Sequence, residues 1–105
     1  MAKGILFVAT NPVEPSREDE FNDWYSNVHV PAILELPGFV GARRYRVISD
    51  GETAHRYMAV YEIERDDVAA AMDELQKATA EGRGGMSDVL QLDPLPQLML
   101  GELIE

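Results

Sequence analysis

The sequence has 105 residues, a mass of 11.7 kDa and a formal net charge of −10. This length predicts a single domain, residues 1–105, which buries about two-thirds of the surface of its unfolded chain. Nineteen acidic against nine basic residues repel phosphate backbones and anionic lipids, so neither nucleic acid nor a membrane is an expected partner. The absence of cysteine excludes disulfides and thiolate metal sites, and it fits a cytoplasmic location.

A strand followed by a helix is predicted at the start of the chain. Residues 3–10 form a short apolar run that ends at Asn11 and Pro12, which is typical of a buried strand closed by a turn. Ser16 then stands three residues before Asp19, in a weaker version of the capping box. Acidic residues at 18–20 suit the positive end of a helix dipole, so we expect a helix to begin near Ser16.

This first helix carries an apolar face, because its apolar side chains recur at three- and four-residue spacing. Pro31 lacks an amide hydrogen and crowds the preceding turn. We therefore expect the helix to kink or break near Val30 and to restart as a short turn at residues 34–36. The apolar face consists of Phe21, Trp24, Tyr25, Val28 and Ala32.

Two β-rich runs follow, at residues 39–48 and 55–63. The turn predicted at residues 49–51, Ser-Asp-Gly, is too short for a parallel crossover, so the two strands form an antiparallel hairpin. Alternation along the first strand places Arg44 and Arg46 on one face, and Arg43 with Tyr45 on the other.

The remaining elements are a second helix, a loop and a last strand. Asp66 is the expected helix cap, and the helix ends near Gly82. Residues 83–94 are predicted to be a loop, with a possible brief turn or arm at 86–92. The apolar residues 95–104 form a strand, and Pro96 favours a sheet edge or a strand start. The apolar stripe of the second helix is Val68, Ala71, Met72, Leu75 and Ala78.

The resulting order, β-α-β-β-α-β, predicts an α+β ferredoxin-like fold, in which two helices cover one face of a four-stranded antiparallel sheet. The middle strands nevertheless carry large side chains on both faces. Met58 and Val60 share one face, and His55, Tyr57 and Tyr61 share the other. Since two helices cannot cover both faces, we expect a second copy of the chain to cover the other one and to close a dimeric α/β barrel.

Several motifs resemble the EthD-like branch of the dimeric α/β-barrel superfamily. They are residues 20–25 (EFNDWY), 28–31 (VHVP), 36–39 (LPGF) and 42–45 (ARRY), within a similarity that spans roughly residues 3–64. The resemblance implies a homodimer with a ligand cavity between the helices and the sheet, or inside the barrel. This superfamily contains cyclases, isomerases, monooxygenases, haem enzymes and members without known activity, so the fold leaves the function open.

His29 is the candidate catalytic residue. On an unbroken helix it lies about 80° from Phe21, at the border between the apolar face and solvent. A histidine in that position titrates near neutrality and can act as a general acid or base on a phenol or enol. The alternative is a structural role, in which His29 donates a hydrogen bond to a backbone carbonyl left unpaired at Pro31.

The candidate substrate-binding residues are aromatic or cationic, and each has a structural alternative. Trp24 could wall a pocket or fill the core, and Tyr25 could orient His29 or reach water. Arg44 could clamp a carboxylate or an enolate, or pair with a surface acid. Tyr57 and Tyr61 could line a cavity or pack a dimer interface.

Two functions from different classes remain. The first is a small cofactor-independent enzyme that cyclises, isomerises or oxygenates an aromatic or polyketide-like molecule. The second is a non-catalytic dimeric module that binds a ligand or assists another protein. The sequence contains no phosphate loop and no nucleophile elbow, and its two histidines are too far apart for a local metal pair. We therefore predict neither a metal nor a cofactor, although the resemblance leaves haem at His29 as an alternative.

Overall fold

The computed structural model describes residues 2–48, 55–83, 85–92 and 95–104. The strands are β1 (Ala2–Thr10), β2 (Phe39–Arg46), β3 (Tyr57–Arg65) and β4 (Gln97–Glu102). The helices are α1 (Glu18–Trp24), α2 (Val30–Leu34) and α3 (Ala70–Ala80), with a 3₁₀ turn before α1 (Pro15–Arg17) and a π-helical turn between α1 and α2 (Tyr25–His29). The predicted turn at residues 49–51 lies outside the described residues.

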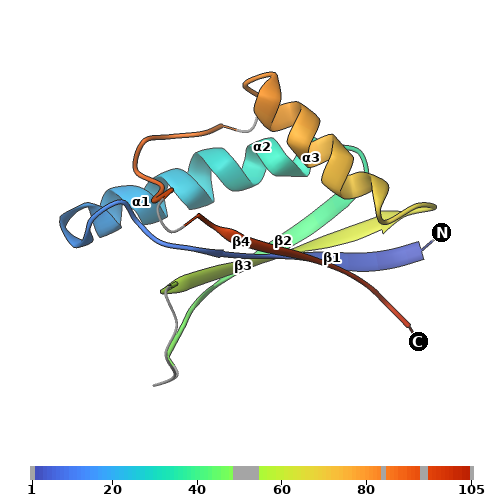
Figure 1. The fold of residues 1–105 in the computed structure, drawn as a ribbon, viewed down its shortest axis with the longest axis horizontal. Coiled ribbons are helices and arrows are strands. Elements are labelled where there is room, and N and C mark those ends of the chain that lie inside the picture. The colour runs from blue at the N-terminus through green and yellow to red at the C-terminus, as the bar shows by residue number, and fades with distance from the viewer. Residues whose placement is uncertain (1, 49–54, 84, 93–94, 105) are drawn as a thin grey trace.

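The four strands form one sheet in the order β2-β3-β1-β4, and all neighbouring strands are antiparallel. The helices lie together on one side of this sheet (Figure 1). The ferredoxin-like fold expected from the order of elements is therefore confirmed. Pro96 directly precedes β4, which is an edge strand, as its missing amide hydrogen predicts.

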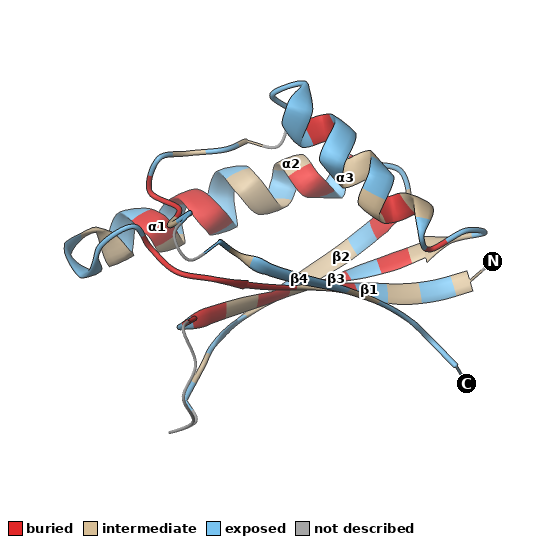
Figure 2. Ribbon diagram, in the orientation of Figure 1, coloured by how far each residue is buried: buried red, intermediate tan, exposed pale blue. Residues whose placement is uncertain are grey.

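The core lies between the sheet and the helices, where both layers carry buried residues (Figure 2). Strand register places Leu6 opposite Tyr61 and Val8 opposite Ala59, and all four are buried on the helix-facing side. On β2, Arg44 lies opposite Ala59 and so shares this side, whereas Arg43 lies opposite Val60 on the other face, in keeping with the predicted alternation.

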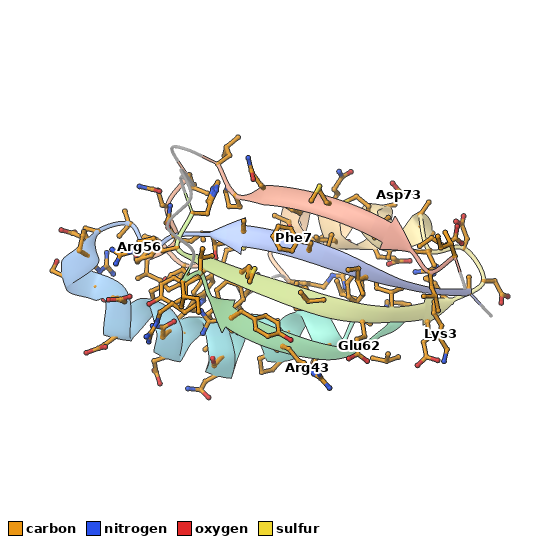
Figure 3. All side chains as sticks on the ribbon, turned by 90° about the horizontal axis from the view of Figure 1, so that it is seen from below. Lys3, Phe7, Arg43, Arg56, Glu62 and Asp73 are labelled. Carbon is orange, nitrogen blue, oxygen red and sulfur yellow. The ribbon has the colours of Figure 1, made fainter. Side chains whose placement is uncertain are left out.

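The opposite face of the sheet is open and largely apolar. Phe7 lies opposite Val60, and both are only half-buried. Figure 3 looks onto this open face, on which Phe7, Arg43 and Glu62 are labelled. The two sets of side chains on β3 therefore lie on opposite faces, as predicted, and the structure shows that Val60 is on the open face and Tyr61 faces the helices. The large apolar side chains of the open face are Ile5, Phe7, Tyr45, Met58, Val60 and Met99.

Of the kink or break expected near Val30, the break is wrong, because the chain stays helical from Glu18 to Leu34. The turn Tyr25–His29 widens instead, and the amide of Val30 donates to the carbonyl of Tyr25, five residues earlier. This wider turn makes room for the proline ring, which would otherwise clash with the carbonyl four residues before it.

The π-turn also aligns two halves of the helical rod. Phe21 and Ile33 are both fully buried but are separated by twelve residues, which places them about 120° apart on a regular α-helix. A turn that absorbs one extra residue reduces this angle to about 20°. The same side of the rod therefore faces the sheet before and after Pro31.

Both predicted helix caps are wrong. Arg17 occupies the N-cap position of α1 and no side chain caps it, since the chain first forms the 3₁₀ turn Pro15–Arg17. At the second helix, the carboxylate of Asp67 accepts a hydrogen bond from the amide of Ala69 at 3.1 Å, in the turn that precedes α3. The N-cap of α3 is Ala69 and not Asp66, and no side-chain hydrogen bond caps it.

Residues 85–92, here called the 85–92 segment, lack a helix or strand as predicted, but they pack firmly against the fold. The amide of Val13 donates to the carbonyl of Val89 at 2.6 Å, and Val89 is fully buried. At the other end of the segment, the indole Nε1 of Trp24 donates to the carbonyl of Gly85 at 2.7 Å. The segment therefore forms part of the helical layer.

Among the described residues, none of the helices combines the length and the apolar character that crossing a bilayer requires.

Candidate functional site

A cavity of about 110 Å³ lies between the helical layer and the sheet. Its apolar walls come from every layer around it: Leu6 and Val8 on β1, Ile33 on α2, Leu75 on α3 and Leu98 on β4. Leu98 is 42% exposed and Met86, from the 85–92 segment, is 48% exposed, so the cavity reaches the surface beside β4. The polar residues of the lining are Thr10, Tyr25, His29, Tyr61 and Thr79.

His29 lines this cavity at the end of the π-turn. Its ring stacks on the Trp24 indole, with 5.0 Å between centroids and 26° between planes. It also meets the Tyr25 ring edge-on at 5.0 Å. The structure thus brings together the three aromatic residues that the sequence singled out on this helix, and two of them, Tyr25 and His29, reach the cavity.

Two buried tyrosines lie at the cavity wall. The hydroxyl of Tyr61 donates to the hydroxyl of Tyr25 at 3.4 Å, and both residues are 1% exposed. Burial raises the pKa of both hydroxyls above the usual value of 10.0, because it disfavours the charged phenolate. Both are therefore protonated donors at neutral pH.

Arg44 lies on the side of Tyr25 that faces β2. Its guanidinium carbon is 4.4 Å from the centroid of the Tyr25 ring, within the range of a cation–π contact. It also lies 5.6 Å from the centroid of Phe21 and 5.7 Å from that of Tyr57. Burial lowers the pKa of the guanidinium, and the nearby tyrosines oppose this change. Phe21, Tyr25 and Tyr57 therefore surround the guanidinium, and we call these three rings the aromatic box. Arg44 does not line the cavity itself.

Tyr57 belongs to this box and also lies outside the cavity lining. Its hydroxyl donates to the carboxylate of Glu18 and accepts a hydrogen bond from Nδ2 of Asn22 at 3.3 Å. Trp24 also lies outside the cavity lining. Its indole ring stacks on His29 and its Nε1 donates to the carbonyl of Gly85. Of the six residues predicted from the sequence, His29, Tyr25 and Tyr61 line the cavity, and Trp24, Arg44 and Tyr57 contact those three or their neighbours.

Sequence reasoning missed most of the apolar lining. Leu75, Met86 and Leu98 come from three elements that are far apart in the chain, and only the fold brings them together. The apolar stripe on the second helix included Leu75 but gave no sign that this residue borders a cavity. Within the described ranges, no three His, Cys, Asp or Glu side chains form a group that could hold a metal ion.

Comparison with known proteins places the chain in a family. Residues 4–81 match the model of a domain of unknown function, DUF4286. The chain belongs to the DUF4286 family. The matched residues run from β1 to the end of α3, so they include most of the cavity but not β4. No curated protein matches the sequence of this DUF4286 member.

Solved structures share the fold of this DUF4286 protein at low sequence identity. An EthD family protein from Bacillus halodurans C-125 has a TM-score of 0.64 and 21% identity, and the match covers 99% of this chain and 100% of that chain. A dimeric ferredoxin-like protein of unknown function from Jannaschia sp. CCS1 has a TM-score of 0.65 and 14% identity, covering 96% and 99%. The resemblance to EthD-like proteins expected from the motifs is thereby confirmed for the fold.

A third structure is that of the haem-degrader MhuD from Mycobacterium tuberculosis, with two haems bound in its active site. Its TM-score is 0.66 at 22% identity, and the match covers 97% of this chain and 96% of MhuD. At this identity the likeness to the DUF4286 protein concerns the fold alone.

Proposed function

We propose that this chain is a single-domain, cytoplasmic homodimer that binds a small aromatic or polyketide-like molecule in the cavity between helices and sheet. His29 acts there as the general acid or base of a cyclisation, isomerisation or oxygenation that needs no cofactor. The observation that carries this proposal is the composition of the cavity, which has apolar walls and a short polar edge formed by His29, Tyr25 and Tyr61. Ligand pockets typically combine apolar walls with a few such polar groups.

The size of the cavity limits what can enter it. Its volume of about 110 Å³ is somewhat below that of engineered apolar cavities of about 150 Å³ that bind benzene. The open side beside Leu98 and Met86 adds room for the rest of a larger molecule. We therefore expect a ligand to insert at most one six-membered ring and to leave further rings at the mouth.

Calorimetric titration with a panel of monocyclic phenols tests this binding mode. We expect the wild-type protein to bind members of the panel, and Leu98→Phe to weaken binding at least tenfold because the larger ring fills the mouth. Met99→Phe is the matched control, since Met99 is the next residue on β4 and points to the opposite face of the sheet. The proposed site is rejected if no phenol binds, or if both variants bind as well as the wild-type protein.

The catalytic role of His29 is tested once a ligand has been found. We expect His29→Ala to abolish conversion of the ligand and to leave ligand affinity and the melting temperature close to those of the wild-type protein. A purely structural histidine gives the reverse pattern, with a lower melting temperature and conversion retained by the folded fraction.

The homodimer is supported by the apolar open face of the sheet. Met99 is 64% exposed, and Ile5 and Tyr45 are 44% and 43% exposed, on the face that no helix covers. Contiguous apolar surfaces of this kind mark interfaces in soluble proteins. The fold neighbours described as dimeric ferredoxin-like proteins agree with this arrangement.

Analytical ultracentrifugation tests the dimer. We expect a particle of twice 11.7 kDa at micromolar concentration. Val60→Asp places a charge on the open face and should release monomers, whereas Val28→Asp, on the exposed side of the helical layer, should leave the dimer intact. A monomeric wild-type protein contradicts the proposal.

The second candidate function is a non-catalytic binding or accessory module. The full burial of Tyr25 and Tyr61 and the modest volume of the cavity favour it, because these side chains also serve as core. A protein that binds phenols but shows no conversion of any ligand, in both the wild type and His29→Ala, fits this module.

A further inference from the structure

Arg44 carries a positive charge that no acid neutralises within the described part of the chain. Its guanidinium donates to Oδ1 of Asn22 at 2.9 Å, to Oγ of Ser26 at 3.0 Å and to the backbone carbonyl of Asn22 at 3.5 Å. All three acceptors are neutral. In a chain with ten more acidic than basic residues, a half-buried arginine would be expected to pair with a carboxylate.

The groups that act on the charge of Arg44 are tyrosines, namely Tyr25, Tyr57 and Tyr61. The carboxylate of Glu18 contacts the aromatic box, but it accepts its hydrogen bond from Tyr57. The other titratable groups around the box are Tyr25, Tyr61 and His29. The positive field of Arg44 therefore acts mainly on the tyrosine pair at the cavity wall.

Tyr25 links this charge to the cavity. One side of its ring contacts the guanidinium, and the residue also lines the cavity. Its hydroxyl accepts a hydrogen bond from Tyr61, so its own proton remains to be donated. A donor backed by a cation in a poorly solvated site favours an acceptor that carries negative charge.

We propose that the Tyr25–Tyr61 hydroxyl pair is an anion-recognising subsite, backed by Arg44, which binds the oxygen of a phenolate or enolate ring. This inference rests on the proposed function and names its ligand class, a six-membered ring with an ionisable hydroxyl. Arg44 is a positioning residue, because it acts through Tyr25. The same arrangement stabilises an oxygen on which negative charge develops when a proton leaves the ring.

The probes are 4-nitrophenol, whose phenolate and phenol absorb differently, and nitrobenzene, which has a similar ring but no ionisable oxygen. We expect bound 4-nitrophenol to ionise about one pH unit lower than free 4-nitrophenol, which corresponds to about tenfold tighter binding of the phenolate. Arg44→Met should remove most of this shift and leave nitrobenzene affinity unchanged within about twofold. Arg44→Lys, which keeps the charge, should restore part of the shift.

Arg43→Met is the matched control, because Arg43 is the preceding residue of β2 and points to the open face. It should change neither the shift nor the affinity for nitrobenzene. Tyr25→Phe, which removes the hydroxyl but keeps the ring, should lose the shift as Arg44→Met does.

The outcomes separate this inference from the function on which it rests. If neither probe binds to the wild-type protein, the cavity is not a ligand site and both fail. If nitrobenzene binds and 4-nitrophenol shows no downward shift, the ligand site stands and the anion subsite is wrong. An equal shift in the wild type, Arg44→Met and Arg43→Met likewise overturns the role of Arg44.

Discussion

Gly4 provides a sharp test of how α3 and β4 are held against the sheet. It lies on the helix-facing side of β1, beneath Val68, which precedes α3. A Cβ atom at this position would be 2.4 Å from the carbonyl oxygen of Gly101 and 2.6 Å from Cγ1 of Val68. These distances are about 1 Å shorter than normal contacts, so Gly4→Ala must push β4 or the start of α3 outward.

The cost follows from this overlap. Overpacking of a core typically costs about 1–3 kcal/mol, and a backbone oxygen in a strand cannot rotate away as a side chain does. Replacing glycine by alanine also restricts the unfolded chain, which raises the free energy of unfolding by about 0.4–1 kcal/mol. Because the overlap is with a backbone oxygen, we take the upper end of the overpacking cost and expect a net loss of about 2 kcal/mol, which lowers the melting temperature by about 8–16 °C for a chain of this size.

Gly101→Ala is the matched control, since Gly101 lies on the adjacent strand and its Cβ would meet only Cγ1 of Ile5, at 3.7 Å. Urea unfolding should place this variant within about 0.5 kcal/mol of the wild-type protein. Equal stabilities for the two alanine variants would refute the packing argument. Because α3 and β4 both line the cavity, Gly4→Ala should also weaken ligand binding, and Gly101→Ala should not.

Further outcomes concern the tyrosine pair and the 85–92 segment. Because burial raises the pKa of the Tyr61 hydroxyl, the unfolded chain loses this proton first. The contribution of Tyr61 to stability is therefore constant below about pH 10 and falls above it by up to about 1.4 kcal/mol per pH unit. Urea unfolding at pH 9 and 11 should show a smaller fall in stability for Tyr61→Phe than for the wild-type protein, and an equal fall would contradict this reasoning. Trp24→Phe leaves the Gly85 carbonyl without its donor and should cost about 1–3 kcal/mol in the same assay. Gly85→Ala, at φ +62°, should cost about 1–2 kcal/mol and speed proteolytic cleavage within the segment, and an unchanged cleavage rate would contradict this.

The strands and helices could be predicted because their signals are local. The alternation of side chains along β3 predicted that Val60 and Tyr61 point to opposite faces of the sheet, and the strand register confirms this. The errors arose where several local signals compete. Ser16 resembles a helix cap, but Pro15 starts a 3₁₀ turn that moves the N-cap of the α-helix one residue onward, to Arg17. Pro31 predicts a kink or break, but a wider turn accommodates the proline and Ile33 stays buried beyond it.

The candidate site was predictable only in part. His29 and Tyr25 are close in sequence, so helix geometry alone related them. The contact of Arg44 with the Tyr25 ring joins β2 to the π-turn, and no spacing in the sequence fixes that distance. The burial of Val89 was missed for the same reason, because the 85–92 segment has no periodic pattern and its position depends on partners such as Val13.

The widened turn at Tyr25–His29 affects any comparison of this helix with a relative whose helix is regular throughout. If residues are counted from Trp24 without a gap, Ile33 and its neighbours are aligned with residues of the relative that lie one position away from their true structural equivalents. A gap of one residue inside the turn restores the match of inward-facing positions. Functional residues transferred from such a relative would otherwise be assigned correctly up to Trp24 and wrongly from Val30 onward.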